Sequence, residues 1–250
     1  MKLKDKVAIV TGGSQGIGEA ISLAYGREGA KVVVVNRTMA KGQAVAEKIT
    51  DSGGTAKALQ CDVSIRNECQ AVVQNVLKEF GTVDIIYQAA GIMINKEIEE
   101  YSEDDWDAMI NTNLKGSFLM SQAVVPIMKE KRYGKIIFTA SIAASTAFPN
   151  ATPYCASKGG VLMLMKALSA EIAQFGINVN CVSPGNTATP LNEHLQADPE
   201  FVKLMASRTP TGRAYITTEE MAGAAVFLAS EDSTAVHGLD LIVDDGWCAI

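Results

Sequence analysis

The chain has 250 residues, of which 48% are hydrophobic and 20% charged, which is enough to bury one large core. A net charge of −6 without a long basic run argues against nucleic acid or an anionic membrane as main partner, and no apolar run is long enough to span a bilayer. The N-terminus lacks the apolar core of a signal peptide, the five cysteines form no C-x-x-C pair and the two histidines have no ligand spacing, so we expect a cytoplasmic protein with reduced thiols and no metal.

The first element is a short apolar run at residues 7–10, which predicts a buried parallel strand. The turn Thr11–Gly18 follows it, and a helix then extends to about Glu28. Glycines in such a turn permit close backbone approach, and the N-terminus of the helix offers free N–H groups to a phosphate. A plain strand-to-helix turn is the alternative, but the position after the first strand favours nucleotide binding.

A second buried strand is expected at residues 32–36. In a nicotinamide enzyme the side chain at its end contacts the adenosine ribose, and an acid there repels a 2′-phosphate. Here the end is neutral Asn36, followed by Arg37 and Thr38, and a guanidinium with a hydroxyl suits a phosphate. The pattern therefore favours NADP(H) over NAD(H), with NAD(H) still possible; the alternative is a solvated Arg37 in a loop.

The alternation of helices and strands continues along the chain. We expect a helix at residues 40–50, a strand at 55–61, a helix at 64–80 and a strand at 83–87 that ends in Gln88–Gly91. Asp62 is expected either to cap the helix at 64–80 or to bind an adenine. With no repeat or linker, the pattern predicts an α/β fold: a single Rossmann-type, doubly wound parallel sheet of about seven strands over residues 1–250.

A capped helix starts near Ser102 and is expected to reach Lys131, with a break at Asn111–Gly116 and a kink at Pro126. Residues 136–141 predict the fifth strand, with Ser141 at its carboxyl end. Ligands of open α/β sheets bind outside those ends. The strand therefore places Ser141 in a candidate site.

The chemistry is expected at the start of a helix over residues 154–175, which follows Pro153. Tyr154 and Lys158 are four residues apart and so share one face of its first turn. A nearby ammonium lowers the pKa of a phenol and makes it a usable acid or base. The spacing alone is also typical of a half-buried tyrosine beside a solvated lysine.

Residues 189–215 have apolar side chains at roughly helical spacing and are interpreted as a helical lid over the substrate. A plain amphipathic helix pair on the sheet is the alternative. The expected pocket wall has few charges, so we predict a neutral secondary alcohol or ketone of modest size. It comprises Met93, Ile94, Asn95, Ala143, Ser145, Phe148, Asn150, Leu191, Leu195, Phe201, Leu204 and Met205.

In this order and spacing the motifs resemble the classical short-chain dehydrogenase/reductase family over nearly the whole chain. They are the glycine turn, Asp62, the 88–91 turn, Asn113, Ser141, Tyr154 with Lys158, Pro184-Gly185 with Thr189, and the strand end at 243–247. Two positions depart from the family: Gln88 stands where Asn is usual and Asp245 where Gly is usual.

The resemblance implies an NAD(P)-dependent oxidoreductase that interconverts a secondary alcohol and a ketone. Its implied catalytic residues are Asn113, Ser141, Tyr154 and Lys158: Tyr154 carries the proton, Ser141 binds the reacting oxygen, Lys158 lowers the pKa of Tyr154 and Asn113 holds a water. The implied cofactor residues are Gly12, Ser14, Gln15, Gly16, Ile17, Gly18, Asn36, Arg37, Thr38, Asp62, Val63, Ala89, Ala90, Gly91, Tyr154, Lys158, Pro184, Gly185, Thr187 and Thr189.

Three further expectations concern class and assembly. Classical members are commonly homotetramers, and the consecutive apolar residues 162–165 need a partner helix. A non-catalytic, dinucleotide-sensing or scaffold protein on the same fold is the alternative function, although loss of Tyr154 or Lys158 would be its mark. An epimerase or dehydratase normally needs a longer chain with a substrate domain.

Overall fold

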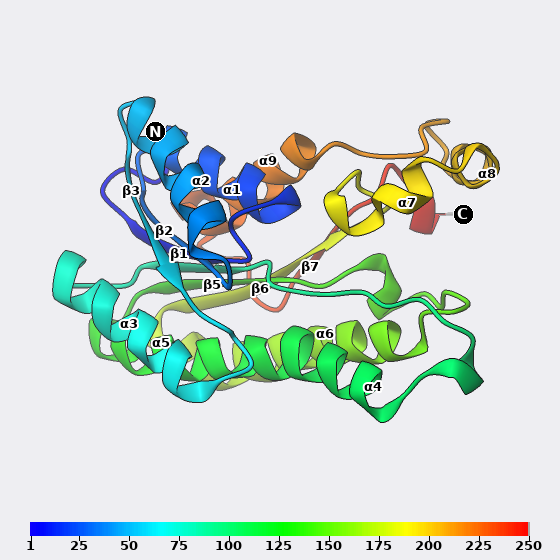
Figure 1. Ribbon diagram of the computed structural model, residues 1–250. Coiled ribbons are helices and arrows are strands. Elements are labelled where there is room, and N and C mark those ends of the chain that lie inside the picture. The colour runs from blue at the N-terminus through cyan, green and yellow to red at the C-terminus, as the bar shows by residue number, and fades with distance from the viewer. Residues whose placement is uncertain (250) are drawn as a thin grey trace.

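The computed structural model describes residues 1–249, which fold into three layers, a sheet between two layers of helices (Figure 1). The sheet has seven strands in the order β3-β2-β1-β4-β5-β6-β7, and all neighbours are parallel. This confirms the predicted doubly wound sheet. The strands are β1 (Val7–Thr11), β2 (Lys31–Asn36), β3 (Thr55–Gln60), β4 (Ile85–Gln88), β5 (Gly134–Thr139), β6 (Ile177–Pro184) and β7 (Asp240–Val243).

Helices cover both faces of the sheet because its central strands are apolar on both sides. In β1, Val7 and Ile9 pack into one core, whereas Ala8 and Val10 pack into the other. One face carries α1 (Gly16–Arg27), α2 (Met39–Asp51) and α9 (Thr218–Ala229), and the opposite face carries α3 (Arg66–Phe80), α4 (Glu103–Met109), α5 (Gly116–Lys131) and α6 (Thr152–Ile172) (Figure 1). The short helices α7 (Glu193–Gln196) and α8 (Pro199–Arg208) lie in the predicted lid segment.

Several element boundaries differ from the prediction. The expected break at Asn111–Gly116 is a π-helical segment, Ile110–Lys115, which joins α4 to α5. Helix α5 continues through Pro126, and β5 ends at Thr139, two residues before Ser141. None of the helices within residues 1–249 is long and apolar enough to cross a membrane.

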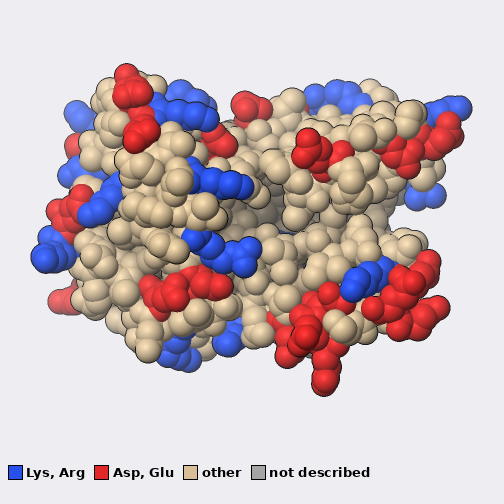
Figure 2. All heavy atoms as spheres, in the orientation of Figure 1, with Lys and Arg blue, Asp and Glu red and all other residues tan. Residues whose placement is uncertain are grey.

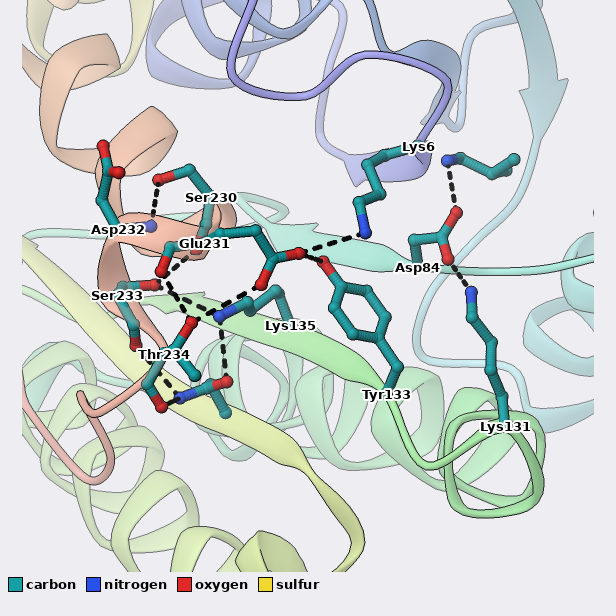
Figure 3. A network of polar contacts seen from close by, with 12 residues as sticks. Lys6, Asp84, Lys131, Tyr133, Lys135, Ser230, Glu231, Asp232, Ser233 and Thr234 are labelled. Atoms are coloured by element: carbon teal, nitrogen blue, oxygen red, sulfur yellow. Dashed lines mark hydrogen bonds and ion pairs between the residues drawn. The ribbon is translucent and has the colours of Figure 1, made fainter.

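Polar contacts tie together the amino-end edge of the sheet (Figure 3). Glu231 accepts hydrogen bonds from the Tyr133 hydroxyl at 3.0 Å and from Lys6 Nζ at 3.2 Å. The buried ammonium of Lys135 donates to Asn178 Oδ1 at 2.9 Å. These contacts fasten the start of the chain to the segment after α9, at the edge opposite the carboxyl ends of the strands.

Candidate active site

A cleft of about 570 Å³ opens at the carboxyl ends of the strands. Figure 2 shows a hollow in this face with basic side chains on one side of it. Every residue that the sequence assigns to the cofactor lines this cleft, and so does Ser141. Segments scattered from Gly12 to Thr189 therefore meet in one place, as expected where the strand order reverses between β1 and β4.

The glycine turn after β1 is shaped by close backbone approach. Gly12 has φ +65°, and a β-carbon on it would lie 2.7 Å from the Ala90 backbone nitrogen. A β-carbon on Gly18 would lie 2.2 Å from the Gly12 carbonyl oxygen. Gln15, the N-cap of α1, makes no side-chain capping hydrogen bond, so N–H groups of the first turn are available to an anion. This arrangement fits a dinucleotide phosphate.

Two cations, on the loop after β2 and in the first turn of α2, line the cleft beside the glycine turn. Asn36 is buried and donates its side-chain amide to the Thr38 carbonyl, which shapes the loop that carries exposed Arg37. Lys41 also lines the cleft, and its ammonium lies 3.4 Å from Gln15 Oε1. Lys41 was not among the predicted cofactor residues, although a basic side chain in the first turn of the helix after β2 was a usable signal.

Asp62 acts as a turn cap. Its Oδ1 accepts hydrogen bonds from the Ser64 backbone N–H at 2.9 Å and from the Ser64 hydroxyl at 2.7 Å. Burial acts in the opposite direction, but these bonds and the charge of Arg37 lower the pKa of Asp62. Because this turn precedes α3, the helix begins at Arg66 and not at residue 64. The carboxylate also lines the cleft, so an adenine contact remains a prediction.

The predicted catalytic side chains meet at the other end of the cleft. Tyr154 and Lys158 lie in the first turns of α6, and Lys158 Nζ is 5.7 Å from the centre of the Tyr154 ring. The Lys158 ammonium donates to the Thr139 carbonyl at 2.7 Å, at the end of β5. Ser141 accepts a hydrogen bond from the Ala143 N–H at 3.1 Å, so its own proton can point into the cleft toward the Tyr154 oxygen or a bound ligand.

The electrostatics of this end differ from the prediction in one respect. Burial raises the pKa of Tyr154 above its ordinary value of 10, and a hydrogen bond with Ser141 partly offsets this effect. Burial lowers the pKa of Lys158 to about 8. Lys158 is not among the causes of this shift, because its ammonium is directed at the Thr139 carbonyl and burial weakens its charged form, so the expected lowering of the Tyr154 pKa by Lys158 stays a prediction.

Asn113 lies behind the cleft, in the π-helical segment, and is 1% exposed. Its Oδ1 accepts from the Ile92 N–H at 2.8 Å, and its Nδ2 donates to the Ile92 carbonyl and to the Ser157 hydroxyl, both at 3.0 Å. The side chain thus fastens the loop after β4 to helix α6. Through Ser157 it holds the helix next to Lys158.

The wall around the substrate end is mostly apolar. Of the predicted wall, Ile94, Ser145, Asn150 and Leu204 do not line the cleft, whereas the other members do. Trp247, near the C-terminus, lines it as well and was missed, because nothing in the sequence pattern links residue 247 to the loops after β4 and β5. Lys158 is the one cation at this end among residues 1–249, since the other lining cations are Arg37 and Lys41.

The departure at Gln88 lies outside the cleft lining. Gln88 is 4% exposed and donates its Nε2 to the Ser121 hydroxyl at 2.9 Å, which joins β4 to α5. Its amide therefore contributes to packing between sheet and helix and leaves the turn Ala89–Gly91 free to line the cleft.

A dinucleotide cleft that ends at a tyrosine, a lysine and a serine defines a nicotinamide-dependent oxidoreductase. The short chain dehydrogenase family model matches residues 6–200, and the chain belongs to this family. It is therefore an NAD(P)-dependent oxidoreductase that acts on alcohols and ketones.

Similar proteins cover the full fold. The D-threitol dehydrogenase of Mycolicibacterium smegmatis is 39% identical over 246 residues, 98% of this chain and 94% of the relative. The 2-dehydro-3-deoxy-D-gluconate 5-dehydrogenase of Pseudoalteromonas atlantica is 36% identical, covering 98% and 96%. The crystal structure of a gluconate 5-dehydrogenase from Burkholderia cenocepacia J2315, in complex with NADP and tartrate, matches with a TM-score of 0.96 at 34% identity and covers 100% of this chain and 97% of that one.

Proposed function

We propose that this protein interconverts a neutral secondary alcohol and its ketone with NADP(H) and that Tyr154 is the proton carrier. The observation that carries the proposal is the layout of the cleft. One end holds Arg37 and Lys41 beside the glycine turn, and the other holds Tyr154, Lys158 and Ser141 in an apolar surround.

The bound nicotinamide supplies or accepts the hydride, and the residues of the chain handle the proton and the oxygen. The Ser141 hydroxyl donates to the reacting oxygen and stabilises the charge that develops there. Tyr154, whose raised pKa keeps it protonated at neutral pH, gives its proton to this oxygen during reduction and removes it during oxidation. Lys158 holds a positive charge beside Tyr154 and is positioned by Thr139 and by the backbone that Asn113 fixes.

Substitution of Tyr154 tests this assignment. Tyr154→Phe keeps the ring and removes only the hydroxyl, so we expect turnover to fall by about two to four orders of magnitude. Binding of NADP(H), followed by titration, should change less than about threefold, because the phosphates and the adenosine bind elsewhere. Near-native kcat in Tyr154→Phe would refute the assignment and leave a dinucleotide-binding protein of another function.

The preference for NADP(H) rests on charge. Arg37 and Lys41 line the cleft on either side of Thr38, and the position at the end of β2 is the neutral Asn36. No acid at that position repels a 2′-phosphate. The bound NADP in the crystal structure of the Burkholderia enzyme supports this choice by similarity.

The substrate is proposed to be uncharged. D-threitol, in the name of one relative, is a neutral polyol, whereas gluconate, in that of another, is an anion. Within the described residues 1–249, the substrate end offers a carboxylate no cation except Lys158, which is buried and bound to Thr139. Residues 189–215 cover this end with Leu191, Leu195 and Phe201, which supports a role as a lid that excludes water.

The protein is further proposed to be a cytoplasmic homotetramer. Met163 on α6 is 61% exposed and Phe118 on α5 is 42% exposed, on helices of the same layer. Exposed large apolar side chains on neighbouring helices are typical of an interface. Light scattering should give about four times the chain mass of 26.5 kDa, and a monomer at micromolar concentration would contradict the proposal.

A further inference from the structure

A pair of stacked aromatic rings stands at the substrate end of the cleft. Phe148, in the loop after β5, and Trp247, near the C-terminus, have ring centroids 5.3 Å apart and planes 23° from parallel. Both residues line the cleft, and both are half-buried. The pair therefore joins the loop that follows Ser141 to the last turn of the chain and presents aromatic surface to the cleft.

An ion pair holds the turn that carries Trp247. Asp245 has φ 57°, in the left-handed region that favours glycine, so a side chain is kept here at a conformational cost. Its carboxylate accepts from Arg213 Nε at 2.8 Å, from Arg213 Nη2 at 2.7 Å and from the Thr211 hydroxyl at 3.0 Å. A bidentate pair of this kind fixes orientation as well as distance. It ties the C-terminal turn to the end of the 189–215 segment.

The neighbouring residue fixes the same turn from its other side. Asp244 accepts hydrogen bonds from the Gly246 N–H at 2.9 Å and from the Cys248 N–H at 2.7 Å. A β-carbon on Gly185 would lie 2.7 Å from the Asp244 α-carbon, so the turn rests directly on the loop after β6. The backbone of Trp247 is thus held between the lid segment and this loop.

The surface around the two rings is mostly apolar and therefore favours an apolar substrate over one with many hydroxyl groups. Met93, Ile142 and Phe201 also line this end and offer no hydrogen bonds. The amides of Asn95 and Asn192 also line the cleft: Asn95 is exposed, and Asn192 already bonds to the Thr187 carbonyl and the Thr189 N–H, both at 3.0 Å. An open-chain polyol would bury more hydroxyl groups than this surface has partners for, which is costly, whereas a compact ring would stack on aromatic faces.

We propose that Trp247 contacts the substrate and determines specificity, that Asp245 and Arg213 position it, and that the substrate is a neutral secondary alcohol or ketone built on a ring. The inference rests on the proposed function, because it names the substrate class of that site. Trp247 thus adds a specificity-determining residue to the residues that carry the proton.

The first test measures turnover of two neutral alcohols, cyclohexanol and D-threitol. The wild type should have at least about tenfold higher kcat/KM for cyclohexanol. Trp247→Ala should raise KM for cyclohexanol about tenfold with kcat within about threefold, and Trp247→Phe should retain most of the affinity because a ring remains. Equal or better use of D-threitol by the wild type, or an unchanged KM in Trp247→Ala, would overturn the proposal.

The second test separates positioning from general stability. Asp245→Gly suits the backbone conformation and removes the whole side chain with its carboxylate, and it should raise KM for cyclohexanol about three- to tenfold. In the Trp247→Ala background the same change should have no further effect on KM, because Asp245 acts through Trp247. Glu220→Gln is the matched control: it removes the other acid of Arg213, at 2.9 Å, and should leave KM unchanged. Additive effects on KM would contradict a positioning role.

A readout without turnover distinguishes this inference from the proposed function. The chain has two tryptophans, so in Trp106→Phe the emission comes from Trp247 alone. Cyclohexanone added in the presence of NADP+ should change that emission in a saturable way, also in Trp106→Phe/Tyr154→Phe. If Tyr154→Phe remained active, the proposed function would fail while this titration still reported contact. If turnover depended on Tyr154 but the emission did not change, only the present inference would fail.

Discussion

The choice of cofactor can be tested at two side chains. Arg37 and Lys41 are both exposed at the mouth of the cleft, on the side of the glycine turn. A hydrogen bond to a charged group contributes about 1.5–3 kcal/mol, and screening at an exposed site reduces this to roughly 1–1.5 kcal/mol. Each alanine substitution should therefore raise the Kd for NADP+ about five- to tenfold, and the double variant about 50-fold.

The assay is a titration of each variant with NADP+ and NAD+. The Kd for NAD+ should stay within about twofold, because NAD+ has no 2′-phosphate, and the preference for NADP+ should shrink as salt screens the two cations. Lys48→Ala is the matched control, since Lys48 lies on the same helix α2 but binds Glu19 at 2.7 Å, outside the cleft lining. Equal wild-type affinity for both cofactors, or an Arg37→Ala variant that weakens both alike, would refute the charge argument.

Two further predictions concern pH. Burial raises the pKa of Tyr154, so kcat for alcohol oxidation, which needs the phenolate, should increase from pH 7 to 10. The kcat for ketone reduction uses the protonated phenol and should not increase over this range. An oxidation rate that falls from pH 7 to 10 would contradict the assignment of Tyr154. Burial tends to raise the pKa of Glu231, but hydrogen bonds from Tyr133 and Lys6 lower it below its ordinary value of 4.5. The charged Glu231 therefore stabilises the fold above pH 4.5, and this contribution is lost as the pH falls through the lower pKa of the folded state. The Lys6–Glu231 pair is largely exposed, so Glu231→Gln should reduce the free energy of unfolding by roughly 0.5–1 kcal/mol at pH 7. This loss corresponds to a Tm lower by about 1–3 °C at pH 7 and by less at pH 3. An equal shift of Tm at both pH values would contradict the role of the charge.

Much of the fold could be predicted because a parallel sheet has a strong sequence pattern. Buried strands appear as continuous apolar runs such as residues 32–35, and most of them are followed by a helix with apolar spacing. The boundaries were less accurate where side chains form turns. Asp62 binds Ser64 and delays α3 to Arg66, and this depends on a local hydrogen bond that the apolar pattern does not reveal.

The site was predicted in part for a similar reason. Residues at the carboxyl ends of strands, such as Ser141, follow from the topology once the strands are known. Lys41 and Trp247 do not, because their place depends on how a helix start and a chain terminus pack. The effect of burial on the pKa of Tyr154 was not predicted, because sequence spacing gives the distance between two groups and says nothing of the water that each one loses.

The π-helical segment Ile110–Lys115 bears on how this chain tolerates changes in length. A π turn contains one residue more than an α turn, so it is equivalent to a single-residue insertion carried within a helix. Deletion of one residue there would let α4 and α5 join as one regular helix with their mutual orientation kept, but side chains within the segment would move around the helix axis by up to about 100°. Asn113 would then lose its hydrogen bonds to Ile92 and Ser157, so a more regular helix would disrupt the active site.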